Sequence, residues 1–375
     1  MDVSFLAAVF SAPGPYATVC ADVTHVTESA DTEVDLRVRA IGEQLTAQGA
    51  PGPVVDAVRS TLLQANDGGR LATLRGRALV VAADGSVVLD EALADAPREP
   101  VARWSPDPDL MPVLRQLAGR VPHVVVVADR VGADLSVAGG TGQQVETQQV
   151  DGDTFHMRKV QVGGWAHNTY MHTAENQWEQ NAGQVADELH AVVTRDGSRF
   201  VLLAGDVRAR QLIADKASQE VAGVLVTMDG GGRAAGADRS VIDARATELI
   251  AENEAAEVTR ALEQVQAAAA HGLAVTGTAP VVEALRKAQV ETLVLGDRSD
   301  GQQLFAGSGP LEIGLTAEEV TSLGVADVQQ VPVDLGLLRA AVGSDAAVVV
   351  VPRAAMPDDV PAAAVLRYAD AATPS

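Results

Sequence analysis

The sequence predicts an α/β protein with a three-domain architecture. Of its 375 residues, 47% are hydrophobic, so the chain can bury several cores of ordinary domain size. Runs of β-branched residues typical of strands alternate with amphipathic helical patterns along most of its length. Two breaks interrupt this alternation, a proline-rich stretch at 97–112 and a glycine-rich loop at 230–236. We therefore expect a linker over 97–112 and domains at 1–120, 121–236 and 237–375.

The first domain is predicted to be a small α/β domain. A strand is expected at 16–23, and the other elements are helices at 30–49 and 53–65 and strands at 71–83 and 87–89. Asp84-Gly85 joins the last two strands and is a hairpin signal. Cys20 lies on the apolar first strand, where a small core residue is expected. A single cysteine excludes a disulfide framework and a cysteine-built zinc site.

The middle domain is predicted to contain an amphipathic helix between two buried strands. The runs Val124–Val127 and Phe200–Gly205 are continuously apolar, as strands buried on both faces are. Between them, apolar residues recur at steps of three and four and form one stripe: Met171, Ala174, Trp178, Ala182, Val185, Leu189 and Val192. This pattern predicts a helix packed through that stripe, with Trp178 in the core.

The third domain is predicted to be a three-layer α/β/α domain, because helical and strand patterns continue to alternate. A long helix rich in Ala and Glu is expected at 238–271. The elements expected after it are helix 280–288, strand 292–295, helix 333–342, strand 346–351 and strand 365–368.

Charge limits the class of partner. The chain has 50 acidic and 28 basic residues and a formal net charge of -22, which argues against DNA and against a protein that coats nucleic acid nonspecifically. Half of that excess, -11, falls within 241–375, which suits a protein or another basic partner better than bare RNA. Because the sequence opens with Met1-Asp2 and contains no apolar run of membrane-spanning length, we expect a cytoplasmic protein without membrane contact.

Motifs for cofactors are missing from the sequence. None of the three lysines follows a glycine, as a phosphate-binding P-loop requires, and there is no His-Glu-x-x-His zinc motif. We expect no cofactor and no metal, and a monomer when the protein is free.

Residues 154–174 form the most distinctive window, because they contain no acidic residue. Arg158 and Lys159 lie in this window, and Phe155, Trp165, Tyr170 and the nearby Trp178 are four of the eleven aromatic residues. RNA contact requires cations for phosphates and flat rings for exposed bases, so Arg158, Lys159 and Tyr170 are candidate RNA-binding residues. A solvated strand edge explains the two basic residues equally well.

Gly163-Gly164 makes the backbone permissive immediately before the predicted helix. Trp165 follows the pair and is interpreted either as a loop anchor or as a functional tip. His167 and His172 are five residues apart, a spacing that does not align two metal ligands on one helix face.

The order of these features resembles the middle domain of archaeal and eukaryotic class I peptide-chain release factors, in which a Gly-Gly-Gln loop heads a long helix and a strand of Val-Leu-Ala-Gly type follows. The run Gly272-Leu273-Ala274-Val275-Thr276-Gly277, with Val281–Leu285 and Val290–Leu295 after it, resembles the family's C-terminal domain of the ribosomal L7Ae type. Leu366-Arg367-Tyr368 is similar to the last strand of that domain. The resemblance covers about 121–370, roughly two-thirds of the chain.

Within this family, the pattern is most similar to the bacterial branch that includes the ribosome hibernation factor Balon, and it also resembles the Vms-type peptidyl-tRNA hydrolases. The resemblance places a loop of Gly163, Gly164, Trp165, Ala166, His167 and Asn168 near the peptidyl-transferase centre. Trp165 stands where release factors have the glutamine. An indole N–H only donates and cannot act as a hydrolytic base, whereas His167 is a candidate base.

The first domain would lie on the decoding side of the ribosome by the same resemblance. It lacks the family's Asn-Ile-Lys-Ser run, so codon-specific termination is not expected. Arg70, Arg75 and Arg77 are candidate contacts to ribosomal RNA, and a plain strand with exposed arginines explains them equally well.

Three hypotheses follow. The resemblance implies a non-enzymatic factor that occupies the A site of the 70S ribosome, contacts ribosomal RNA and keeps the ribosome inactive under stress, with elongation factor Tu as a candidate partner. The alternative is a peptidyl-tRNA hydrolase that acts on stalled ribosomes and uses His167 or a neighbour. The third is a stress-induced binding module without a ribosomal role.

Overall fold

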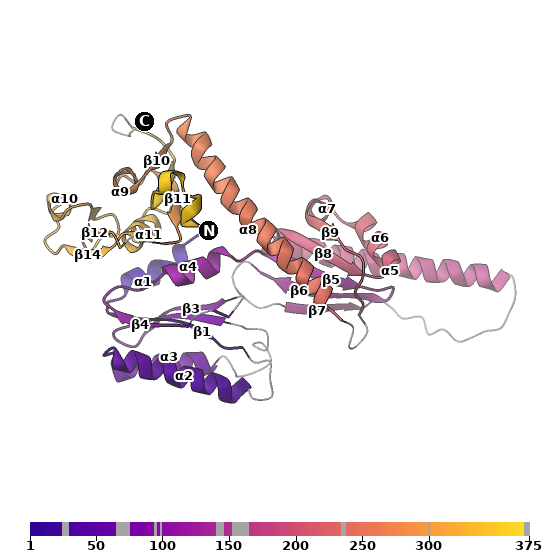
Figure 1. Cartoon of the computed structure of the whole chain (residues 1–375). Coiled ribbons are helices and arrows are strands. Elements are labelled where there is room, and N and C mark those ends of the chain that lie inside the picture. Colours follow the sequence, from indigo (N-terminus) through magenta and orange to yellow (C-terminus); the bar gives the residue numbers. More distant parts are fainter. Residues whose placement is uncertain are drawn as a thin grey trace. The chain divides into compact units, whose positions relative to one another are not determined.

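A computed structural model describes residues 1–24, 30–64, 76–93, 96–97, 100–139, 146–151, 165–233, 238–298 and 301–370. It confirms the α/β class, with strands arranged in separate sheets (Figure 1). Contacts divide the chain into two compact units: unit 1 comprises 1–119 and 256–375, and unit 2 comprises 120–255. The division into three domains stays a prediction. Within the ranges described, none of the helices is long and apolar enough to cross a bilayer.

The N-terminal part of unit 1 is an antiparallel sheet with strand order β3-β2-β1-β4. Its strands are β1 (Tyr16–Asp22), β2 (Gly76–Ala82), β3 (Val87–Leu93) and β4 (Val101–Ser105). Because side chains alternate along a strand, Val19 and Val81 pack under α2 (Ala30–Ala47) and α3 (Gly52–Leu63). Cys20 and Val80 belong to the cluster on the other face, with η1 (Ser4–Leu6), α1 (Ala7–Ser11) and α4 (Met111–Ala118). Cys20 is 1% exposed, as expected of a core residue.

The proline-rich stretch is not simply the predicted linker. Val101–Ser105 within it forms β4, which pairs with β1 at the edge of the sheet. Pro100 precedes the strand and Pro106 follows it, so neither removes a donor from within the ladder. The prolines therefore bound an edge strand, and the prediction was wrong for these five residues.

The C-terminal part of unit 1 has a sheet with strand order β10-β16-β11-β15, formed by β10 (Ala274–Thr276), β16 (Ala362–Leu366), β11 (Val290–Gly296) and β15 (Ala347–Val351). Leu293 and Leu295 share a cluster with α9 (Thr278–Arg286) and α11 (Val333–Gly343). Val294 packs on the other face against Val265 of α8 (Ser240–Ala269). These contacts confirm the three predicted layers.

A second, smaller sheet follows β11 in the chain, and the sequence pattern did not predict it. Its strand order is β13-β12-β14, formed by β12 (Gln303–Ala306), β13 (Ile313–Gly314) and β14 (Gln329–Pro332). The helix α10 (Ala317–Ser322) connects β13 to β14. Both parts of unit 1 contribute to one buried cluster, and the backbone of Met1 pairs with that of Val348 in β15.

Unit 2 has a sheet with strand order β7-β6-β5-β8-β9, formed by β5 (His123–Ala128), β6 (Gly132–Ala138), β7 (Glu146–Asp151), β8 (Phe200–Gly205) and β9 (Leu225–Thr227). One face packs against α5 (Trp165–Asp196), α6 (Val207–Lys216) and α7 (Gln219–Val224). The first turns of α8 cover the other face through Ile242, Ala246 and Leu249. Because β5, β8 and β9 run parallel, their carboxyl ends meet at one edge.

The amphipathic helix predicted between the buried strands is α5. Ala182, Val185, Leu189 and Val192 of the predicted stripe are all buried against the sheet. For 165–177, the backbone alone is described, and it is helical. Figure 1 shows this N-terminal part of α5 extending beyond the strands of its own sheet. The helix therefore has a packed half and a half that continues past the sheet edge.

Candidate functional site

The candidate site lies at the carboxyl ends of β5 and β8, where parallel α/β sheets commonly bind their partners. The turn from Asp129 to Gly132 follows β5, and Asp206 follows β8 as the N-cap of α6. Trp178 of α5 approaches the same place. Three elements that are distant in the sequence thus converge at the base of the extended part of α5.

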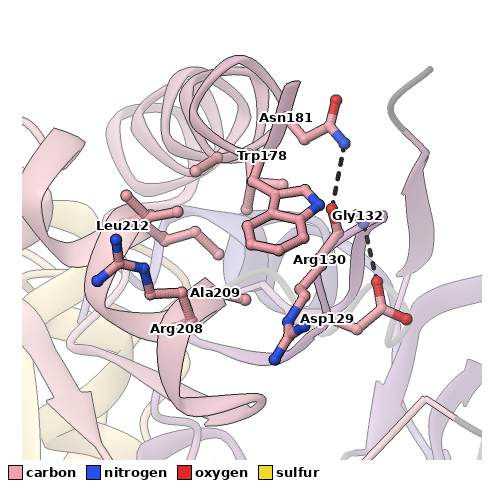
Figure 2. A pocket seen from close by; sticks show the side chains of 11 residues that line it. Asp129, Arg130, Gly132, Trp178, Asn181, Arg208, Ala209 and Leu212 are labelled. Atoms are coloured by element: carbon pink, nitrogen blue, oxygen red, sulfur yellow. Dashed lines mark hydrogen bonds between the residues drawn. The ribbon is translucent and has the colours of Figure 1, made fainter. Parts of the chain in front are cut away.

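Arg130 connects these three elements (Figure 2). Its guanidinium carbon lies 4.9 Å from the centroid of the Trp178 ring, within the range of a cation–π contact. Its Nη2 atom is 3.5 Å from a carboxylate oxygen of Asp206. At a half-exposed position a cation–π contact contributes about 0.5–1 kcal/mol. The sequence predicted Trp178 in the core, but the residue is only partly buried. The guanidinium of Arg130 lies over one face of its ring.

Asn181 fastens α5 to the same turn one helical turn further along. Its side-chain amide donates hydrogen bonds to the carbonyl oxygens of Arg130, at 3.3 Å, and Val131, at 3.2 Å. The residue is 4% exposed, so these bonds satisfy a buried polar group, and losing them would cost about 1–3 kcal/mol. Figure 2 shows the amide pointing at the turn from the helix side.

Hydrogen bonds and ion pairs hold the turn itself in place. The carboxylate of Asp129 accepts hydrogen bonds from the backbone N–H groups of Val131 and Gly132 and forms an ion pair with Arg233 at 3.1 Å. Arg233 also pairs with Asp134 of β6 at 3.0 Å and is 10% exposed at its side chain. The turn that receives α5 is thus fixed from both the strand side and the segment before α8.

Asp206 caps α6 with its carboxylate, which accepts hydrogen bonds from the backbone N–H groups of Arg208 and Ala209. Burial opposes the ionisation of Asp206, but these amide bonds and the charge of Arg130 outweigh it and lower the pKa of the carboxyl. The carboxylate therefore stays ionised at neutral pH and available to Arg130.

Two facing glycines allow β8 to end where it does. Gly205 donates a backbone hydrogen bond of 3.0 Å to the carbonyl of Gly230, and both residues have positive φ, +110° and +96°. A Cβ atom on Gly205 would lie 2.0 Å from the carbonyl oxygen of Ala128, whereas one on Gly230 would meet nothing within 4 Å. Arg210 donates to the Gly205 carbonyl and forms an ion pair with Asp229 at 2.6 Å.

The crevice at this site is too small for a ligand. Its volume is about 10 Å³, which is room for one water molecule. Among the residues that the structure describes, no cluster of His, Cys, Asp and Glu side chains could hold a metal ion. The contacts of Trp178 and Asn181 with the turn make the described part of the site a support for α5.

The predicted loop and RNA-binding residues lie only partly within the described chain. Gly163, Gly164, Arg158, Lys159, Arg70 and Arg75 are outside the described residues. Trp165, Ala166, His167, Asn168 and Tyr170 are the first residues of α5, so the helix begins directly after the glycine pair. Their proposed roles stay predictions.

Arg77 is the one predicted RNA contact whose side chain is described. It lies on β2 and forms a two-bonded ion pair with Asp90 of β3, at 2.7 and 2.6 Å. It also donates to the carbonyl of Thr61, and its side chain is 14% exposed. The guanidinium is thus engaged within its own domain, between β2, β3 and α3.

Sequence reasoning did not identify Arg130, Asn181 or Asp206. Asp206 carries a local signal, because an Asp between an apolar strand and a helical pattern is a typical N-cap. Arg130 and Asn181 carry none, because their partners are distant in the sequence.

Residues 122–271 match the family described as bacterial archaeo-eukaryotic release factor family 2. The chain is also 27% identical over 342 residues to the protein Rv2629 of Mycobacterium tuberculosis, covering 90% of each. Among solved structures, it is similar to archaeal Pelota in a ribosome-bound model with ABCE1 (17% identity, 97% of this chain and 93% of that one, TM-score 0.40).

Saccharomyces cerevisiae Dom34, a translation termination-like factor that interacts with Hbs1, is also similar (11% identity, 78% and 79% covered, TM-score 0.42). The family match spans the whole of α5 and α8 and nearly all of unit 2.

Proposed function

We propose that the chain is a cytoplasmic translation factor that binds the 70S ribosome in the A site, on the premise that residues 122–271 match a bacterial family related to the archaeo-eukaryotic release factors. The family match over the unit that contains α5 is the observation that carries this proposal. In it, the N-terminal end of α5 presents residues 163–168 to the peptidyl-transferase centre, and Arg158, Lys159 and Tyr170 contact ribosomal RNA.

We further propose that binding inactivates the ribosome during stress and does not release the peptide. Trp165 supports this, because it occupies the position after the glycine pair and an indole N–H can only donate. A ring at this position can stack on a base but cannot activate a water molecule. The chain would then occupy the A site without catalysing a reaction, as a hibernation factor does.

The acidic C-terminal third supports a protein partner. Residues 241–375 contain half of the net negative charge, which disfavours an RNA partner there and suits a protein surface that offers basic groups. Elongation factor Tu is the candidate we propose for this surface.

A pelleting assay tests the ribosomal role. Purified chain is sedimented with vacant 70S ribosomes at several salt concentrations, and wild type is compared with Arg158→Glu/Lys159→Glu. If both residues contact phosphates, the charge reversal weakens binding to the ribosome. It also makes the negative slope of the logarithm of the association constant against the logarithm of the salt concentration shallower by roughly 1.5–2, because fewer counterions are released.

The matched control is Arg260→Glu/Arg298→Glu, which makes the same charge change at two exposed residues in the acidic third. We expect it to bind with the wild-type slope. Failure of the wild-type chain to pellet would refute the ribosomal role, and equal losses in both double variants would show a general charge effect in place of RNA docking.

Peptide release tests the hydrolase alternative, which His167 in the first turn of α5 keeps open. Stalled ribosomes that carry labelled peptidyl-tRNA are incubated with wild type and with His167→Ala. We expect no release above background from either. Release by wild type that His167→Ala abolishes would replace the hibernation proposal with peptidyl-tRNA hydrolysis.

A further inference from the structure

The support at the base of α5 has a geometry that fixes the direction of a helix. The contacts of Trp178 and Asn181 with one turn lie three residues apart, so they occupy the same helix face, about one turn from each other. With two contacts on one face, those of Trp178 and Asn181, the helix cannot tilt about one contact without straining the other. Trp178 is the most N-terminal residue of α5 whose side-chain contacts are described.

The part of α5 beyond this support is long. Trp165 precedes Trp178 by thirteen residues, so the helix start lies about 20 Å from the support at 1.5 Å per residue. A tilt of about 10° at the support would displace the first turn by about 3 Å over that length. A small loosening at Trp178 is therefore amplified at Trp165 and His167.

The two fastenings differ in kind. Asn181 holds the backbone of the turn through two carbonyl oxygens, so it sets where α5 crosses the turn. Trp178 meets the side chain of Arg130, which Asp206 of α6 holds from the other side. The position of the Trp178 ring therefore depends on the Arg130 side chain, which forms an ion pair with Asp206 of α6.

We infer that Trp178, through Arg130 and Asp206, is a positioning residue that aims the N-terminal half of α5. Arg130 joins α5 to α6, so the direction of the helix is set relative to the sheet and not by the helix alone. The inference deepens the proposed function, because it names the contacts that position residues 165–168. It rests on the proposed function only for the role of these residues at the peptidyl-transferase centre.

Distances between two spin labels in the free chain test the inference. One label is attached at Asn168→Cys in α5 and the other at Thr227→Cys in β9, an exposed position in the sheet. The native Cys20 does not interfere, since burial raises its pKa to about 12 and keeps the thiol unreactive. A control pair at Asp215→Cys and Thr227→Cys reports on the body of unit 2 alone.

Trp178→Phe keeps an aromatic face for Arg130, and Trp178→Leu keeps an apolar side chain without one. We expect a single narrow distance distribution for wild type and for Trp178→Phe. Trp178→Leu and Arg130→Met should broaden the distribution for 168–227 by about 3 Å, with the control pair unchanged. Equal distributions for the Phe and Leu variants would overturn the inference, as would equal broadening of the control pair.

Pelleting with 70S ribosomes separates this inference from the proposed function. Wild-type chain that pellets, together with a Trp178→Leu variant whose distance distribution matches wild type, would refute the positioning role and leave the ribosomal role intact. Broadening in Trp178→Leu with no pelleting of wild type would refute the ribosomal role and support the positioning of the helix.

Discussion

Replacement of Gly205 by alanine should open the edge of the sheet on which the candidate site is built. The residue ends β8 with φ at +110°, and an added Cβ would lie 2.0 Å from the carbonyl oxygen of Ala128 in β5. A left-handed conformation costs an L-residue about 1–2 kcal/mol, and overpacking adds about 1–3 kcal/mol. The sum is a loss of about 2–5 kcal/mol, because the obstacle is backbone and cannot rotate away.

Gly230→Ala is the matched control. Gly230 faces Gly205 across an isolated bridge and also has positive φ, but its Cβ would meet nothing within 4 Å. It should lose only the conformational cost of about 1–2 kcal/mol. The difference between the two variants therefore measures the close approach of β8 to β5.

Hydrogen exchange is the suitable assay, because a chain with two units need not unfold in one step. Opening free energies are compared for peptides from β5 and β8, with β11 of unit 1 as an internal reference. We expect protection in β8 to fall about 5- to 150-fold further in Gly205→Ala than in Gly230→Ala, which corresponds to the overpacking cost of about 1–3 kcal/mol. Equal losses in the two variants would refute the steric argument.

Three further predictions concern single groups. Asp206→Ala should destabilise unit 2 by about 1 kcal/mol at pH 7 through loss of the N-cap. Because the folded-state pKa of Asp206 is lowered, this difference should persist above about pH 4 and vanish as pH falls through that lowered pKa, which hydrogen exchange of α6 at several pH values would detect. Cys20 should react with a thiol reagent only after unfolding, since burial raises its pKa to about 12, and fast reaction of the native chain would contradict the burial. Arg77→Asp/Asp90→Arg should recover part of the stability that each single change removes, with about 0.5–1 kcal/mol of coupling in a double-mutant cycle; a loss of ribosome pelleting in the refolded swap would instead assign Arg77 to RNA contact.

The sequence predicted the elements whose burial leaves a strong local pattern. The runs at 124–127 and 200–205 became β5 and β8 because a strand covered on both faces must be continuously apolar. The stripe through Leu189 became the packed face of α5 for the corresponding reason of helical period.

Elements that depend on a partner strand were missed. β7 reads Glu-Thr-Gln-Gln-Val-Asp, and its pairing with β6 rather than its own composition makes it a strand. β4 was obscured by the prolines on either side of it. The contact of Arg130 with Trp178 joins residues on separate elements, so no local pattern could encode it.

The discontinuity of unit 1 has a consequence for how the chain is made. Unit 2 is contiguous and can complete its core while the last 120 residues are still to be synthesised, but the buried cluster of unit 1 contains side chains from both ends of the sequence. At about 5–20 residues per second, the remaining synthesis takes about 6–24 s. During that interval, Val3, Leu6 and Val9 lack their C-terminal partners. The N-terminal sheet therefore emerges with its η1, α1 and α4 layer only partly covered, and chaperone binding during synthesis should concentrate on that layer and end when β15 emerges.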